Sequence, residues 1–201
     1  MKYLVPDYLY TPDGLQTNKA ISISDDGRIA AVVPYTEGRA FPGADSVAAE
    51  IELLPGVALL PGFVNAHSHV FQRALRGHTH RPLSQQDSFW TWRRAMYAEA
   101  QRMTPELLYE GAVRAYREML AAGYTTVGEF HYVHHQPDGT PYASPNAMSH
   151  ALLQAGRDAG IRVVLLMTAY ASSGFNQPPE EGQRRFCDAS VEAYLERVES
   201  L

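Results

Sequence analysis

The stretch Leu59-Leu60-Pro61-Gly62-Phe63-Val64-Asn65-Ala66-His67-Ser68-His69 decides the fold of this chain. An apolar run typical of a strand breaks at Pro61-Gly62, resumes, and ends on two histidines at positions i and i+2. Because alternate side chains of a strand point to the same side, His67 and His69 can each direct a ring nitrogen toward one point beyond the strand. Two imidazoles that converge in this way form half of a metal site, and a catalytic site keeps a position open for water.

The surroundings of this pair distinguish it from a chance His-x-His. The apolar run that contains Val57, Leu59 and Val64 is predicted to be a buried strand, and it leads into a loop. In parallel α/β sheets and barrels, functional groups lie at the carboxyl ends of strands. A second pair, His78 and His80, has no strand leading into it and is predicted to lie in a solvated loop.

Composition favours a protein that acts on a small molecule. The net charge of -5 comes from 17 basic and 22 acidic residues without long like-charged runs, which argues against nucleic acid or an anionic membrane as a partner. With Cys187 as the one cysteine, no intrachain disulfide can form, and a cytoplasmic location is expected. Cys187 is expected to pack rather than act as a nucleophile. Met1 to Pro6 lacks the apolar core of a signal peptide, and no window approaches the roughly 18 apolar residues of a membrane span.

Residues 1–58 are predicted to form a small antiparallel β unit, the N-terminal part of a β-sandwich domain. Residues 20–24 and 28–33 alternate, and Asp25-Asp26-Gly27 between them predicts a hairpin. Pro55-Gly56 predicts a turn just before the histidine strand.

From residue 59 the pattern changes to strands that alternate with helices. Helices are predicted at 89–102, from Thr104-Pro105 to Gly123, from Ser144-Pro145 to Gly160, and from about 189 to the last residue; strands are predicted at 124–130 and 161–168. The last strand is nearly continuously apolar, as expected when both faces are covered. Three such βα units imply a parallel sheet, and a barrel needs eight. Residues 59–201 are therefore expected to be the first part of a larger α/β fold.

Several motifs resemble one enzyme family. The segment 61–69 resembles the first metal motif of the amidohydrolase superfamily, and four further segments look like formimidoylglutamate deiminases within it. These segments are His69-Val70-Phe71-Gln72-Arg73-Ala74, Ser88-Phe89-Trp90-Thr91-Trp92-Arg93, Glu129-Phe130-His131-Tyr132-Val133-His134-His135 and Glu181-Gly182-Gln183-Arg184-Arg185-Phe186. The likeness runs from about residue 55 to the end. It implies the first three βα units of a distorted (β/α)8 barrel, truncated, beside a β-sandwich.

The resemblance implies one Zn²⁺ ion and a reaction of N-formimino-L-glutamate with water to give N-formyl-L-glutamate and ammonia in histidine breakdown. It assigns His67 and His69 as metal ligands, and Gln72, Arg93 and Tyr132 as substrate-binding residues. Without the resemblance, Gln72 would be interpreted as a surface amide, Arg93 as an ordinary helix-surface arginine and Tyr132 as an aromatic residue at the rim. The aromatic residues before Arg93 offer a frame for bidentate binding of a carboxylate. A homodimer is compatible with the superfamily.

The resemblance also sets limits on what this chain can do. His131, His134 and His135 are expected to shape the pocket or pack beside it, and Glu129 to be a structural or supporting carboxylate. The later metal ligands and the catalytic residues are expected beyond Leu201, so no catalytic residue is assigned in this chain. The polypeptide alone is expected to bind zinc weakly and not to turn over.

Two other interpretations stay open. The chain could belong to a different amidohydrolase, such as a guanine, cytosine or S-adenosylhomocysteine deaminase or a triazine chlorohydrolase, which share the opening motif. Carboxylate recognition by Arg93 separates these from the deiminase. Alternatively, the chain could be an inactive fragment with a structural role only.

Overall fold

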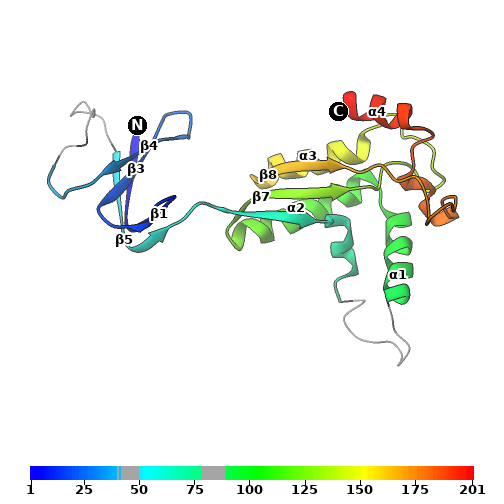
Figure 1. Ribbon diagram of the computed structural model, residues 1–201, viewed down its shortest axis with the longest axis horizontal. Coiled ribbons are helices and arrows are strands. Elements are labelled where there is room, and N and C mark those ends of the chain that lie inside the picture. The colour runs from blue at the N-terminus through cyan, green and yellow to red at the C-terminus, as the bar shows by residue number, and fades with distance from the viewer. Residues whose placement is uncertain (40, 42–49, 78–88) are drawn as a thin grey trace. The chain divides into compact units, whose positions relative to one another are not determined.

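The structure is a computed structural model that describes residues 1–39, 41, 50–77 and 89–201. The predicted loop of His78 and His80 lies outside the described residues. The chain divides into two compact units, Met1–Pro61 and Gly62–Leu201, which are described separately below (Figure 1).

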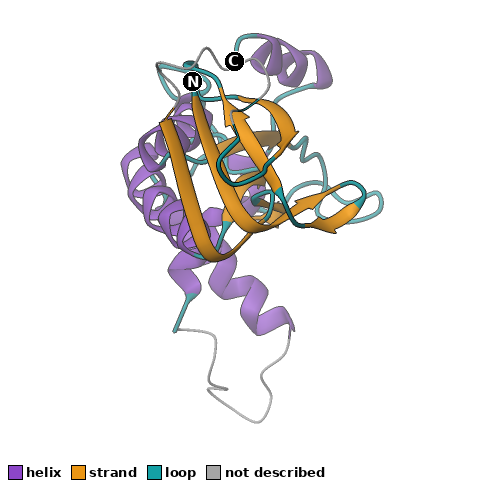
Figure 2. Cartoon of the chain, turned by 90° about the vertical axis from the view of Figure 1, so that its left-hand side faces the viewer, coloured by secondary structure: helices purple, strands orange, loops and turns teal. Residues whose placement is uncertain are grey.

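The first unit is a five-stranded sheet (Figure 2). Its strands are β1 (Lys2–Thr11), β2 (Gly14–Gln16), β3 (Lys19–Ile23), β4 (Ile29–Pro34) and β5 (Glu50–Leu59). The order is β2-β1-β3-β4, with β5 on β1. The predicted hairpin is confirmed, because β3 and β4 pair antiparallel around Gly27, whose φ of 78° suits a tight turn. Tyr3 and Phe41 stack in the small core of this unit, with ring centroids 3.9 Å apart.

Two predictions for this unit are wrong. The sheet is mixed rather than antiparallel, because β5 pairs parallel to β1 after the long connection from β4. Pro55-Gly56 is not a turn between strands, since β5 runs through it. The register shifts opposite Pro6, and the Gly56 amide donates to the Asp7 carboxylate at 2.8 Å, so the Pro-Gly pair forms an irregularity within the strand.

The second unit has a three-stranded parallel sheet in the order β6-β7-β8. The strands are β6 (Phe63–Ser68), β7 (Tyr124–His131) and β8 (Arg162–Met167). The helices are α1 (Phe89–Arg102), α2 (Pro105–Ala121), α3 (Ala147–Ala159) and α4 (Val191–Glu199), and the 3-10 helices are η1 (Val70–Leu75) and η2 (Glu181–Phe186). In Figure 1, α2 and α3 run alongside the strands.

The ends of these helices follow from local chemistry. The Thr104 hydroxyl accepts a hydrogen bond from the Leu107 amide and caps α2, with Pro105 at the first position, as predicted. Gly160 ends α3 in the left-handed region, with a φ of 86°. The helix α3 begins at Ala147, slightly later than predicted from Ser144-Pro145, and α4 ends at Glu199. None of the helices in the described ranges is long and apolar enough to cross a bilayer.

The sheet of the second unit is covered on one face only. Val127 on β7 is fully buried toward the helices, and Val163 and Leu165 on β8 pack against the same core. On the other face Val164 and Leu166 are 49% and 43% exposed. The expectation that the third strand is covered on both faces is therefore wrong. The expectation of a buried histidine strand is wrong as well, since Phe63 and Val64 are exposed.

Candidate metal centre

His67 and His69 converge at the carboxyl end of β6. That strand ends at Ser68, and the two imidazole Nε2 atoms lie 3.0 Å apart. One ion can contact both nitrogens at the usual zinc–nitrogen distance of about 2.0–2.1 Å, because the separation is shorter than twice that length. His67 is exposed and His69 half-buried, so the point of convergence is open to a ligand.

The tautomer of His69 fits metal binding. Its Nδ1 lies 3.1 Å from the Phe130 carbonyl oxygen, which can only accept, so Nδ1 carries the hydrogen and Nε2 keeps its lone pair. Burial lowers the pKa of His69 below its ordinary value, opposed by the Phe130 bond and aided by His67, which favours the neutral ring that metals require. Within the described ranges, no group of three or more His, Cys, Asp or Glu side chains could hold an ion. The described residues thus bring together two candidate ligands and no complete metal site.

Glu129 joins the ends of β6 and β7. Its Oε1 accepts a hydrogen bond from the Val70 amide at 2.7 Å, and its carboxylate also interacts with the Ser68 hydroxyl. Ser68 and Val70 flank His69, so this buried carboxylate fixes the backbone that carries the metal ligand. Burial raises the pKa of Glu129 to about 7, while the two hydrogen bonds act in the opposite direction.

Gln72 and Tyr132 come together although they lie 60 positions apart in sequence. Gln72 is on η1, directly after the histidines, and its Nε2 donates to the Tyr132 hydroxyl at 3.0 Å. The Tyr132 ring contacts that of His69, with centroids 5.7 Å apart. Burial raises the pKa of Tyr132 to about 12, so the hydroxyl keeps its proton. Both predicted substrate-binding residues therefore stand beside the histidine pair.

Arg93 lies on α1 between two aromatic rings. Its guanidinium carbon is 5.4 Å from the centre of the Trp90 ring and 5.2 Å from that of Tyr97. Its Nε donates to the Tyr97 hydroxyl at 2.9 Å. Trp90 belongs to the aromatic frame that the sequence indicated, whereas Tyr97, one helical turn further along, is the partner that holds the guanidinium.

A cavity of about 180 Å³ lies beside Tyr132 and Tyr97, the partners of Gln72 and Arg93. Its lining residues are Met96, Tyr97, Phe130, Tyr132, Thr168 and Tyr170. Sequence reasoning missed Tyr97 and Tyr170, as well as Gln183, which hydrogen-bonds both hydroxyls. The sequence signal that could have identified Tyr97 is its i+4 spacing from Arg93. Gln183 lies in the segment Glu181–Phe186, which resembles the deiminases but was assigned no function from sequence. Nothing in the loop after β8 marked Tyr170.

His134 and His135 belong to a buried ionic cluster that does not include His67 or His69. Asp188 binds Arg197 through both carboxylate oxygens, at 2.8 and 2.6 Å, and accepts from the His135 Nε2 at 3.1 Å. The His134 Nε2 donates to the Thr168 carbonyl oxygen at 2.9 Å, and its Nδ1 accepts from Arg197. Burial lowers the pKa of His134 to about 4, helped by the Arg197 charge. His131 is also buried and stacks edge-on with His134.

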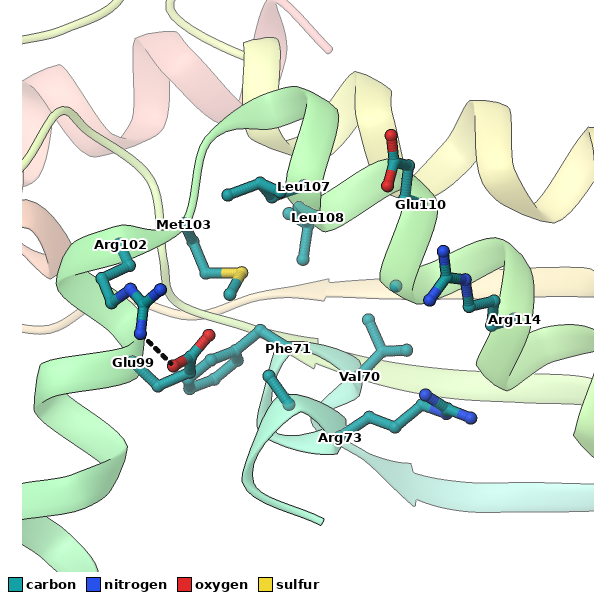
Figure 3. Close-up of a pocket in the computed structure, with 12 residues that line it drawn as sticks. Val70, Phe71, Arg73, Glu99, Arg102, Met103, Leu107, Leu108, Glu110 and Arg114 are labelled. Carbon is teal, nitrogen blue, oxygen red and sulfur yellow. Dashed lines mark ion pairs between the residues drawn. The ribbon is translucent and has the colours of Figure 1, made fainter. Parts of the chain in front are cut away.

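A separate hollow of about 260 Å³ lies between η1, α1 and α2 (Figure 3). Three of its charged side chains form ion pairs: Arg102 pairs with Glu99 at 3.9 Å, and Arg73 pairs with Glu118. The hollow is lined by Val70 and Phe71 from the residues just after His69, but by neither histidine of the pair. We therefore assign no chemistry to it.

Comparisons with known proteins agree with this geometry. The chain is 45% identical over 191 residues to a formimidoylglutamate deiminase of Pseudomonas aeruginosa, an alignment that covers 94% of this chain and 40% of that protein. The crystal structure of an amidohydrolase from Brucella melitensis matches with a TM-score of 0.80 and 36% identity, over 100% of this chain and 44% of the other. The atrazine chlorohydrolase TrzN of Arthrobacter aurescens, complexed with zinc, shares the fold, with a TM-score of 0.69 and 21% identity over 100% and 42%.

The chain thus spans less than half the length of these relatives. The sequence profile described as the amidohydrolase family matches residues 58–201, which is most of the chain. On this match, the chain belongs to the amidohydrolase family.

Proposed function

We propose that these residues form the first three βα units of an amidohydrolase barrel, and that the complete protein hydrolyses N-formimino-L-glutamate to N-formyl-L-glutamate and ammonia. In this proposal the protein is a cytoplasmic enzyme of histidine breakdown that uses one zinc ion. The observation that carries it is that Gln72 and Tyr132 lie beside His69, and that Arg93 is held by Tyr97, which lines the same cavity as Tyr132. Identity to the Pseudomonas deiminase supports the choice of substrate.

The site residues have complementary tasks in this reaction. His67 and His69 would hold the ion, which when bound lowers the pKa of water to about 7 and so activates it for attack. Arg93, held by Tyr97 and Trp90, presents its guanidinium to a substrate carboxylate. The remaining ligands and the groups that move protons are proposed to come from sequence beyond Leu201.

Gln72 and Tyr132 would orient the reacting end of the substrate. The Gln72 amide already donates to the Tyr132 oxygen, which leaves the tyrosine proton for an acceptor; in this structure that acceptor is the Met96 sulfur at 3.7 Å. A thioether is a weak acceptor, so a substrate oxygen or nitrogen can replace it at little cost. Met96 and Tyr132 also line the cavity, which excludes water from one side of the bound molecule.

Ammonia release tests the proposal directly. The full-length protein should release ammonia from N-formimino-L-glutamate, and the 201-residue chain should not, because it supplies two metal ligands. Comparable rates from both would show that the missing ligands are not required. A nucleobase or triazine substrate is the competing reading, and the aromatic lining of the cavity is the observation in its favour.

Arg93→Ala distinguishes these readings. Loss of a guanidinium that binds a carboxylate should raise KM for N-formimino-L-glutamate by about 100-fold or more in the full-length protein. Arg94→Ala, at the exposed neighbouring position, is the matched control and should leave KM unchanged. An unchanged KM in Arg93→Ala would favour a substrate without a carboxylate at this position.

A further inference from the structure

Two tyrosine hydroxyls meet at the cavity beside the histidine pair. The Tyr97 and Tyr170 oxygens lie 3.5 Å apart, and both side chains line the cavity. Tyr97 comes from α1, and Tyr170 from the loop after β8. The ring of Phe186, which is fully buried, contacts both tyrosine rings and that of Tyr132, with centroids 5.2 to 5.9 Å away. The packing of the Phe186 ring against both tyrosine rings therefore holds the two hydroxyls in place.

The orientation of the Gln183 amide fixes the direction of the hydrogen bonds. This side chain is fully buried, and its Oε1 accepts from the Glu180 amide at 2.7 Å, so Nε2 must face the tyrosines. Nε2 carries two hydrogens, and it donates to the Tyr97 oxygen at 2.8 Å and to the Tyr170 oxygen at 3.1 Å. Both hydroxyl oxygens are thus acceptors toward Gln183.

Counting the remaining hydrogens leaves at least one free hydroxyl donor. The Tyr97 oxygen also accepts from Arg93 Nε at 2.9 Å, which occupies both its lone pairs. The Tyr170 oxygen accepts from Gln183 and is also hydrogen-bonded by Arg93, so the acceptor capacity of both tyrosine oxygens is used by these two side chains. Among the described residues, the two tyrosine protons have no other acceptor than the neighbouring hydroxyl 3.5 Å away, which at most one of them can use, and both side chains line the cavity. The cluster therefore offers the cavity a hydroxyl donor next to a guanidinium.

We propose that Tyr170 is a specificity-determining residue whose hydroxyl donates a hydrogen bond to a substrate carboxylate bound by Arg93. Gln183 is the positioning residue that turns this proton toward the cavity. The cluster joins one cation to donors and contains no carboxylate, so the ligand that satisfies it is an anion with several acceptor oxygens. This inference rests on the proposed function, in which the substrate carries two carboxylates.

The test is Tyr170→Phe in the full-length protein, with two independent readouts. Steady-state kinetics with N-formimino-L-glutamate gives kcat and KM, and calorimetry gives the Kd of the product N-formyl-L-glutamate without any turnover. We expect KM and Kd each to rise about 10- to 100-fold, with kcat within about threefold, because a hydrogen bond to a charged group is lost. Tyr109→Phe is the matched control: its hydroxyl bonds Asp158 on the exposed surface, and both constants should stay unchanged.

Gln183→Met tests the positioning role of Gln183. As a second variant, it keeps the test from depending on the folding of Tyr170→Phe alone. It keeps the volume and the Tyr170 hydroxyl but removes both donated hydrogens, so KM and Kd should rise, and Tyr170→Phe should add little in that background. Unchanged Kd and KM in Tyr170→Phe overturn the inference while the proposed function stands. If the unaltered protein releases no ammonia, the proposed function fails, and the Kd comparison still decides the role of Tyr170. Absence of any N-formyl-L-glutamate binding by the unaltered protein overturns the inference as well.

Discussion

Replacing Asp188 by alanine should destabilise the second unit severely. The carboxylate binds Arg197 in a bidentate manner and also accepts from His135, and the side chains of the ion pair are only 4% and 7% exposed. Alanine would leave the Arg197 charge buried without its anionic partner. Removing one member of a buried pair costs about 3–5 kcal/mol, far more than the 0–1 kcal/mol of a surface pair.

Urea unfolding followed by tryptophan fluorescence measures this loss. The two tryptophans of the chain, Trp90 and Trp92, both lie on α1, so the signal reports on the second unit. With an m-value of about 2 kcal/mol per molar, a loss of about 4 kcal/mol lowers the midpoint by about 2 M. Asp158→Ala, which removes an exposed carboxylate, is the matched control and should shift the midpoint by less than about 0.5 M.

A second variant separates the buried charge from simple loss of volume. The pair Asp188→Leu with Arg197→Met replaces both charges by apolar side chains, and it should recover much of the stability lost in Asp188→Ala. A midpoint for Asp188→Ala that matches the Asp158→Ala control would refute the reasoning, because the ion pair would then contribute no more than a surface one.

Three further changes test separate parts of the structure. His134 has a pKa of about 4 in the folded state and of about 6.5 in the unfolded state. The unfolded state therefore binds more protons between these two pH values, and the free energy of unfolding falls as the pH drops. In urea titrations, His134→Gln should remove about 2 kcal/mol of the stability loss between pH 7 and pH 5. Gly156→Ala on α3 should lower the free energy of unfolding by about 1–3 kcal/mol, because the new Cβ would lie 2.4 Å from Val163 Cγ2. In the control Gly111→Ala on α2, the new Cβ meets nothing within 4 Å, so the melting temperature should rise slightly. Glu129→Gln should weaken zinc binding by the full-length protein about 10-fold in a chelator competition; unchanged affinity would show that Glu129 does not hold the His69 backbone.

Local signals predicted the elements of this chain well. The cap at Thr104, the glycine stop at Gly160 and the hairpin at Gly27 each depend on a few neighbouring residues, and the structure confirms all three. The placement of His67 and His69 at a strand end is of the same kind, since alternation along one strand is a local property.

Long-range pairing and burial were outside the reach of such signals. Parallel pairing of β5 with β1 depends on where a long connection returns, and nothing in the residues of β5 encodes that direction. An apolar strand also does not say whether its second face is covered, as the exposed Val164 and Leu166 show. The role of Tyr170 depends on Gln183 and Tyr97, which come from two other segments of the chain.

The proposed metal-binding residues and the proposed carboxylate-binding residues lie on different elements of the second unit. The end of β6 carries the proposed metal ligands, and Glu129 on β7 fixes the backbone around His69. The residues proposed to recognise a carboxylate lie instead on α1 and η2, where Arg93 and Gln183 meet at the Tyr97 hydroxyl. Because these groups share no hydrogen bond with the histidines, substitutions in the Arg93 group should alter substrate affinity without altering metal affinity.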